Sequence, residues 1–165
     1  MNKLIKVSET VTRLTFNTAA VLLALAAMLV FYQVITRFVF GHSAVWSEVW
    51  ARAVIVWGVF LVLGPAIRHS RMIPIDVIRS LFSQNKRIWI IRTVSVAVAL
   101  FLLVLIWFGY KMTLRVVDQQ AAMLNLSVAW FYVAIPVGAL LAIPGLFLAQ
   151  LDAENEHRQL SEVSK

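Results

Sequence analysis

Long apolar runs separated by short charged segments dominate the chain. Four stretches carry no charged side chain, namely residues 14–36, 53–67, 93–110 and 119–151. A helix needs about 20 apolar residues to cross the hydrocarbon core of a membrane, so the first, third and fourth stretches can each span it unaided. The second stretch reaches that length only if its helix begins near Val45, inside the charged segment that precedes it.

We therefore predict an all-α membrane protein whose single domain, residues 1–151, contains four transmembrane helices. The predicted helices cover residues 14–40, 46–67, 89–110 and 126–150. Residues 74–86 have a helical, amphipathic pattern but are too few to span, so we expect a short helix lying in the membrane interface between helices two and three. The polar residues 152–165 form a tail that we expect to fray.

Small residues recur at helical spacing in two of the predicted helices. The first helix carries Ala20 and Ala24, and the fourth carries Ala134, Gly138, Ala142 and Gly145. Such stripes let another helix approach closely, either within the chain or across a subunit interface. Prolines are expected to bend the fourth helix at Pro136 and Pro144 and to end the second near Pro65.

The composition excludes an ordinary soluble domain, because 61% of the residues are hydrophobic and only 14% are charged. The chain has no cysteine, so it has neither a disulfide framework nor a thiolate metal site. The histidines, His42, His69 and His157, fall in separate segments and do not make a haem or metal site. We expect no cofactor.

Basic residues orient the predicted helices. Of the fifteen Lys and Arg residues, eleven lie in the N-terminal segment, the middle connection and the tail. The positive-inside rule then places both termini and the connection between helices two and three in the cytoplasm. The net charge of +7 describes this rim, and it calls for no nucleic-acid partner. The first apolar run is longer than a signal-peptide h-region, so we expect a retained helix.

Three charged residues, Arg37, Glu48 and Arg52, flank the loop between the first two helices. Glu48 and Arg52 have the favourable i,i+4 order for an ion pair, and Arg37 can compete for Glu48 and so tie the two helices together. One interpretation is an interfacial pair that only ends a helix; the other is that charges near membrane depth mark a partner or a pathway. Tryptophans near the helix ends are typical of an aromatic belt.

Little in the chain indicates chemistry. We find no nucleophile with a base, no paired intramembrane carboxylates and no Gly-rich phosphate loop, so we do not expect an enzyme. The two halves also lack the inverted repeat that many secondary transporters have. Helices with charges only at their rims favour an accessory membrane subunit.

Four segments carry a resemblance to a known family: VITRFVFGHSAVWSE, VWGVFLVLG, IPIDVI and LNLSVAWFYVAIPVGALL, which together run from residue 34 to residue 141. In this order they resemble the small membrane subunit, of DctQ or SiaQ type, of tripartite ATP-independent periplasmic (TRAP) transporters. The chain departs from the family pattern at Val49, where a second Glu is frequent, and at Met72, where a His is frequent.

The resemblance implies a four-helix bundle in the bacterial inner membrane. It implies two partners: a large multi-helix membrane subunit with the substrate and sodium sites, and a periplasmic protein that delivers an organic acid of the C4-dicarboxylate or sialic acid class. The small subunit would stabilise the large one and offer part of the docking surface. Arg37, Glu48 and Arg52 would then form an outer charged cluster facing these partners, and Lys111, Arg115 and Asp118 would contact the binding protein.

Two alternatives remain open from the sequence. A small homodimeric transporter would use Glu48 as its essential carboxylate, and a membrane electron carrier would show a visible absorption spectrum. The sequence leaves undecided both the transported acid and the helix that faces the large subunit. The stripe of the fourth helix and the Ala20–Ala24 pair are the first candidates for that contact.

Overall fold

The computed structural model describes residues 2–42, 44–70, 84–120 and 127–163. Their regular structure is helical, in the order α1 (Asn2–Val39), α2 (Val45–Leu61), α3 (Leu63–Ser70), α5 (Gln84–Arg115), α6 (Ala129–Tyr132) and α7 (Ala134–Val163). An isolated antiparallel bridge pairs Gln120 with Ser127. The predicted all-α class is confirmed for these residues.

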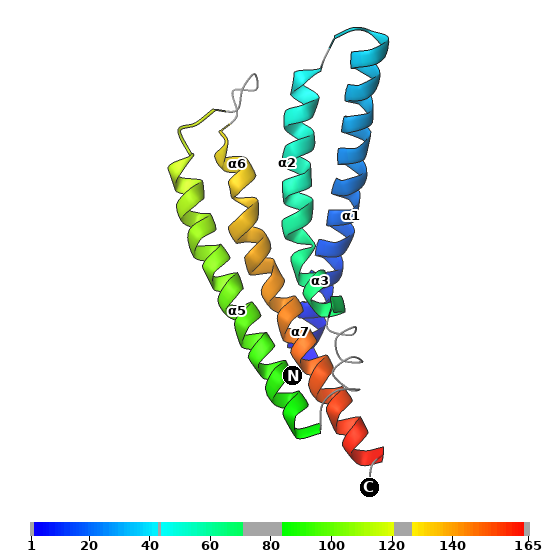
Figure 1. Ribbon diagram of the computed structural model, residues 1–165, viewed down its shortest axis with the longest axis vertical. Coiled ribbons are helices and arrows are strands. Elements are labelled where there is room, and N and C mark those ends of the chain that lie inside the picture. The colour runs from blue at the N-terminus through cyan, green and yellow to red at the C-terminus, as the bar shows by residue number, and fades with distance from the viewer. Residues whose placement is uncertain (1, 43, 71–83, 121–126, 164–165) are drawn as a thin grey trace.

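Three helical segments are long and apolar enough to cross a membrane: Lys3–Val39, Arg92–Arg115 and Ala129–Ala153. Trp46–Leu61 and Leu63–His69 pass the same test together, as one span bent by 40°. The described residues therefore hold three candidate spans, or four if the bent pair counts as one. Figure 1 shows these helices running lengthwise, with both termini toward one end and the loops after α1 and α5 at the other. Which end faces the cytoplasm stays a prediction from the basic residues.

A proline bends the second span where the sequence predicted its end. Pro65 lies four residues after Leu61 and has no N–H to donate to the Leu61 carbonyl, so the helical ladder is interrupted there. The ladder resumes at once, because the Ala66 N–H donates to the Val62 carbonyl at 2.9 Å. The prediction that the helix ends near Pro65 is thus wrong, and α3 continues to Ser70.

A proline also separates α6 from α7. Pro136 lies four residues after Tyr132, and Val133 stands between the two helices. The Val137 N–H donates to the Val133 carbonyl at 3.2 Å, so the chain stays helical beyond the break. The second predicted proline of this span, Pro144, lies inside α7.

Most helices extend beyond their predicted apolar cores. The helix α1 begins at Asn2 and α5 covers Gln84–Arg115, because charged residues at their ends continue the helix instead of stopping it. The helix α7 runs to Val163, so the segment expected to fray is helical there. Its residues include strong helix formers such as Glu, Gln and Leu. The predicted amphipathic helix falls mainly outside the described residues, and only residues 84–86 belong to them, at the start of α5.

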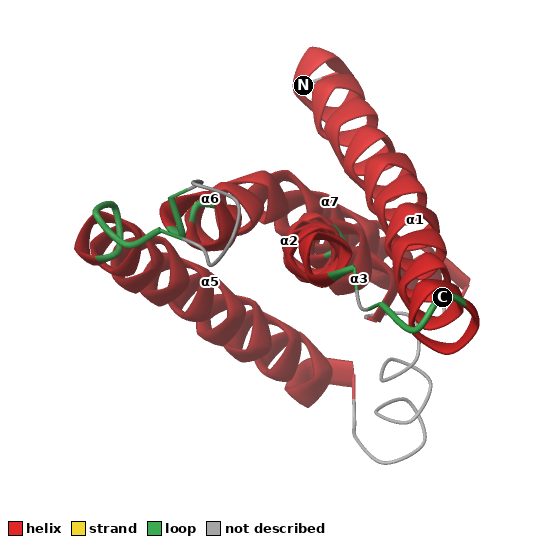
Figure 2. Cartoon of the chain, turned by 90° about the horizontal axis from the view of Figure 1, so that it is seen from above, coloured by secondary structure: helices red, strands yellow, loops and turns green. Residues whose placement is uncertain are grey.

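The helices form an open arrangement around α7. Among the described helices, α7 contacts α1, α2, α3 and α5, whereas α5 contacts only α6 and α7. Seen from above in Figure 2, α5 and α1 lie on opposite sides of α7 and α2. The resemblance implied a four-helix bundle, and within the described part of the chain α5 joins the other helices only through α6 and α7. Only 11% of the most apolar stretch of α1 and 17% of that of α5 are buried, so both present broad apolar faces.

Candidate functional site

The small-residue stripe of α7 packs against the bent span α2–α3. A Cβ atom added to Gly138 would lie 2.6 Å from the carbonyl oxygen of Phe60, and one added to Gly145 would lie 2.6 Å from the carbonyl carbon of Gly64. Ala134 and Ala142, on the same stripe, are fully buried. The sequence left open whether the stripe packs within the chain or against another subunit. In the structure it packs within the chain. The stripe is therefore covered by α2 and α3 of the same chain.

A glycine that the sequence reading did not single out joins α5 to α7. A Cβ on Gly109 would lie 2.8 Å from Cγ2 of Ile135 and 2.9 Å from Cδ of Pro136. This close approach lies beside the break between α6 and α7, at the contact that holds α5. The sequence did offer a signal for this contact. A single Gly inside a long apolar helix often marks a place where another helix packs closely.

The packing face of α1 is offset from its predicted alanine pair. Ala20 and Ala24 are exposed in this chain, whereas Ala19 and Ala26 are buried. The Ala19 carbonyl lies 3.7 Å from the position of a Cβ on Gly58 of α2, which is ordinary van der Waals distance. Both residues of the Ala20–Ala24 pair are therefore exposed in the described part of the chain, with Ala20 at the edge of a groove between α1 and α2.

The outer charged cluster forms in part. The Arg52 guanidinium donates to Glu48 at 3.0 Å, as the i,i+4 order predicts. The second Glu48 oxygen accepts from the Gln33 amide at 3.5 Å, so Gln33 and not Arg37 makes the weak link between α1 and α2. Arg37 is exposed and makes no ion pair with any residue that the structure describes. Because both members of the Glu48–Arg52 pair are well exposed, it adds less than about 1 kcal/mol to stability.

The second predicted group lies at the same end of the molecule, at the end of α5 and in the loop that follows it (Figure 1). Lys111, Arg115 and Asp118 are all exposed. The Lys111 ammonium sits 5.0 Å from the centroid of the Trp107 ring, a cation–π distance within α5. Since α5 does not contact α2, the structure does not bring Lys111 and Arg115 together with the Glu48–Arg52 pair.

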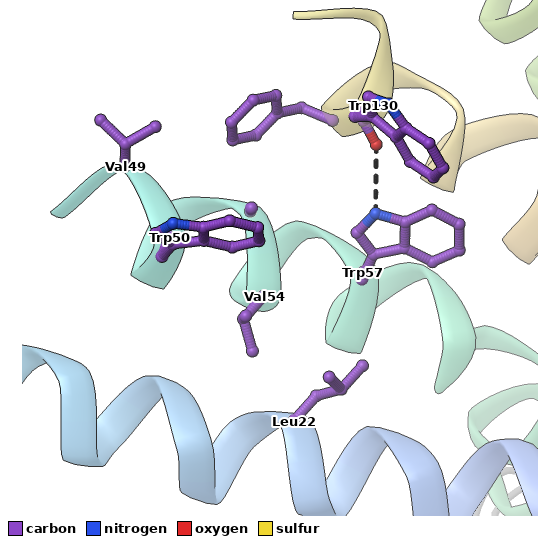
Figure 3. Close-up of a pocket in the computed structure, with 8 residues that line it drawn as sticks. Leu22, Val49, Trp50, Val54, Trp57 and Trp130 are labelled. Atoms are coloured by element: carbon purple, nitrogen blue, oxygen red, sulfur yellow. Dashed lines mark hydrogen bonds between the residues drawn. The ribbon is translucent and has the colours of Figure 1, made fainter. Parts of the chain in front are cut away.

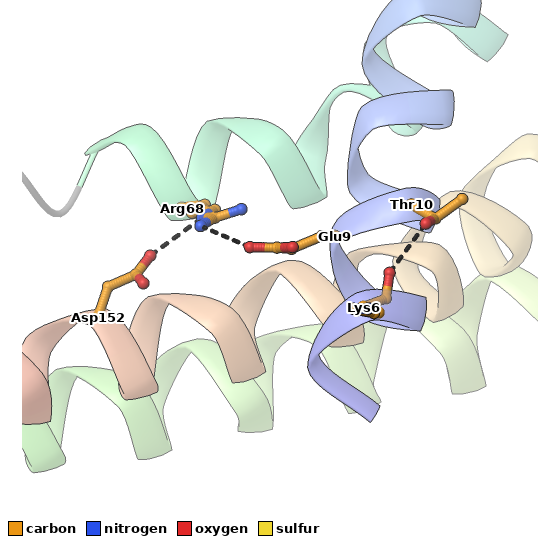
Figure 4. A network of polar contacts seen from close by, with 5 residues as sticks. All are labelled: Lys6, Glu9, Thr10, Arg68 and Asp152. Atoms are coloured by element: carbon orange, nitrogen blue, oxygen red, sulfur yellow. Dashed lines mark hydrogen bonds and ion pairs between the residues drawn. The ribbon is translucent and has the colours of Figure 1, made fainter. Parts of the chain in front are cut away.

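The structure contains a charged cluster at the opposite end of the molecule that the sequence analysis did not predict. Arg68 of α3 donates from Nε to Asp152 of α7 at 3.0 Å, and its Nη2 lies 3.9 Å from Glu9 of α1 (Figure 4). The Arg68 side chain is only 27% exposed. One guanidinium thus links three helices that are far apart in the sequence. No local spacing could have found this cluster, because its acids lie 59 and 84 positions from Arg68.

An apolar groove between α1, α2 and α6 contains a second tie. The Trp57 indole N–H donates to the Trp130 carbonyl at 3.1 Å and so fastens α2 to α6 (Figure 3). The groove has a volume of about 400 Å³, and Leu22 and Val54 also line it. Trp130 is 64% exposed, which suits the predicted belt position near a helix end.

A family model supplies the identification. The sequence model of the DctQ component of tripartite ATP-independent periplasmic transporters matches residues 26–151. The chain belongs to this family. The matched region of this DctQ component starts inside α1 and ends inside α7, so it contains the outer pair, the bent span and the small-residue stripe. The search of curated proteins found no significant match.

Membership in the DctQ family makes the chain a small membrane component of a TRAP transporter. The family consists of transporter subunits and not of enzymes, in agreement with the sequence-based expectation. Among the described residues of this DctQ component, no three His, Asp or Glu side chains gather closely enough to share a metal ion.

Proposed function

We propose that this DctQ component is a scaffold subunit of a TRAP transporter in the bacterial inner membrane. It binds and stabilises the large transport subunit and contributes to docking of the periplasmic substrate-binding protein. The transporter takes up an organic acid of the C4-dicarboxylate or sialic acid class, with sodium coupling in the large subunit. The family match over residues 26–151 carries this proposal.

The open arrangement of the helices supports the scaffold role. The apolar faces of α1 and α5 lack partners within the described chain, and α5 is held by α6 and α7 alone. A large membrane subunit packed on one of these faces would bury surface that lipid otherwise covers. We therefore assign the partner contact to α1 or α5, in place of the covered stripe of α7.

The charged outer end supports the docking role. We place both termini in the cytoplasm, which puts Arg37, Glu48, Arg52, Lys111, Arg115 and Asp118 on the periplasmic side. Exposed charges of this kind steer a soluble partner and set its orientation more than they add affinity. The rival function, a homodimeric transporter working through Glu48, gains no support, because this side chain is half exposed in the first turn of α2 and already paired with Arg52.

Purification of the tagged chain from native membranes in mild detergent tests the proposal. We expect a much larger multi-helix protein to co-purify in roughly equal amount, identified by mass spectrometry, and to be missing when the same membranes carry the untagged chain. Liposomes containing the purified chain alone should show no uptake of organic acids. A chain that purifies only with itself and transports alone would replace the scaffold reading with the Glu48 transporter.

Neutralising the outer charged cluster tests the docking role separately. In the triple variant Arg37→Gln, Glu48→Gln, Arg52→Gln, we expect normal assembly but about a fivefold loss of uptake at low binding-protein concentration, with a weaker dependence on salt. The matched control is Lys3→Gln, Lys6→Gln, Arg13→Gln at the other end, which should leave docking unchanged. Uptake at the wild-type level in the outer variant would remove the cluster from the docking surface.

A further inference from the structure

A second groove runs between α2 and the α6–α7 span. Unlike the groove that contains Trp57, it has no lining residue from α1. It has a volume of about 530 Å³. Its polar lining residues are Arg52, Gln120 and Tyr132, and its apolar ones include Val56, Phe60 and Ile135. Arg52 belongs to the proposed outer cluster and Phe60 packs against Gly138, but neither assignment accounts for the open space between them.

The polar and apolar residues of the groove are ordered along α2. Arg52, Val56 and Phe60 are spaced by four residues, so they lie on one face and cover about 12 Å of helix, at 1.5 Å per residue. Arg52 lies nearest the end that carries the loops after α1 and α5, and Gln120 belongs to the second of these loops. Arg52 and Gln120 therefore lie toward the membrane surface, beside Val49 and Val128, whereas Val56 and Phe60 lie deeper along α2.

The Arg52 guanidinium keeps hydrogen-bonding capacity for a ligand. Its Nη2 donates to one oxygen of Glu48, and the structure gives it no other partner among the described residues. A guanidinium has five N–H donors, and the Arg52 side chain is 72% exposed. The remaining donors match the oxygens of a phosphate, which arginine binds with particularly favourable geometry.

We propose that this groove is a phospholipid-binding site. The phosphodiester accepts hydrogen bonds from Arg52, and one acyl chain lies along Val56, Phe60 and Ile135. The position of Arg52 toward the membrane surface, with Val56 and Phe60 deeper on the same face of α2, matches a lipid standing in the leaflet on that side. The site requires only that the bent span crosses the bilayer, so it is independent of the partner subunits.

The size of the groove suits an acyl chain. A volume of about 530 Å³ falls within the range of roughly 300–1,000 Å³ that small ligands occupy. An acyl chain also satisfies the apolar walls, and the charge of Arg52 complements the phosphate at its head.

Photo-crosslinking from Val56 tests what fills the groove. A photoreactive amino acid replaces Val56 in the full chain, and membranes are irradiated before the chain and its bound partners are purified. We expect adducts of phospholipid mass, reduced at least fivefold by Arg52→Ala and unaffected by Arg37→Ala. The same label at Val21, on the exposed face of α1, should give bulk-lipid adducts that do not depend on Arg52. Adducts to a protein at Val56, or lipid adducts insensitive to Arg52, would overturn the proposal.

Lipid retention gives a second readout that does not depend on removing Arg52. Native mass spectrometry of the purified chain titrated with phosphatidylglycerol should show a tightly held lipid. The variant Val56→Trp keeps the arginine but fills the groove, and we expect it to lose that lipid at least fivefold while remaining helical by circular dichroism. Equal retention by wild type and Val56→Trp would place the lipid elsewhere and refute the site.

Discussion

Replacing Gly145 with alanine is expected to lower the free energy of unfolding by about 3 kcal/mol, the largest single-residue effect that we predict. The added Cβ would lie 2.6 Å from the carbonyl carbon of Gly64 and 2.8 Å from its Cα. These are backbone atoms, so no side chain can rotate away, and α7 and α3 must separate. Unfolding of the purified chain in mixed micelles of increasing dodecyl sulfate content measures the change.

The matched control for Gly145→Ala is the same substitution at Gly58. That glycine also faces a neighbouring helix, but the nearest atoms to its added Cβ lie at 3.7 and 3.8 Å. Alanine has the higher helix propensity, so Gly58→Ala should be neutral or stabilising by up to about 1 kcal/mol. Equal destabilisation by both substitutions would mean that the small-residue stripe does not set the distance between α7 and α3.

The apolar runs predicted the helices well because hydrocarbon imposes a length on each span. Long uncharged segments can satisfy their backbone polar groups in a membrane only as helices, which is why α1, α5 and α6–α7 were found. The bend at Pro65 was harder to predict. A proline after an apolar run can end a helix or kink it, and the ladder resumes at Ala66 because α3 packs on α7 through Gly64.

Local spacing also predicted one contact of the outer end and missed the others. The Glu48–Arg52 pair lies within one helix, so its i,i+4 order was sufficient. Whether Gln33 or Arg37 reaches Glu48 depends on the rotation of α1 against α2, which follows from the packing of Ala19 and not from either polar residue. Small-residue spacing identified the stripe of α7, but it could not say that the chain itself covers this stripe.

Reversing the charge of Arg68 is expected to destabilise the chain by about 1–2 kcal/mol, the second large effect. The variant Arg68→Glu would place a third carboxylate beside Asp152 and Glu9, where like charges repel instead of linking α3 to α7 and α1. The partial burial of Arg68 raises the effect above that of a surface pair, while the exposure of the two acids, 41% and 52%, keeps it moderate. The same mixed-micelle unfolding measures it.

Restoring the pair with exchanged charges separates electrostatics from packing. The double variant Arg68→Glu, Asp152→Arg should recover most of the lost stability, and the cycle with the two single variants should give a coupling energy of about 1 kcal/mol. The reference is Arg52→Glu, in the exposed pair at the other end, where we expect about 0.5 kcal/mol or less. A double variant no more stable than its parents would show that Arg68 acts through the packing of its stem. Strong coupling would instead show that Arg68 holds the bent span α2–α3 on α7 through its charge.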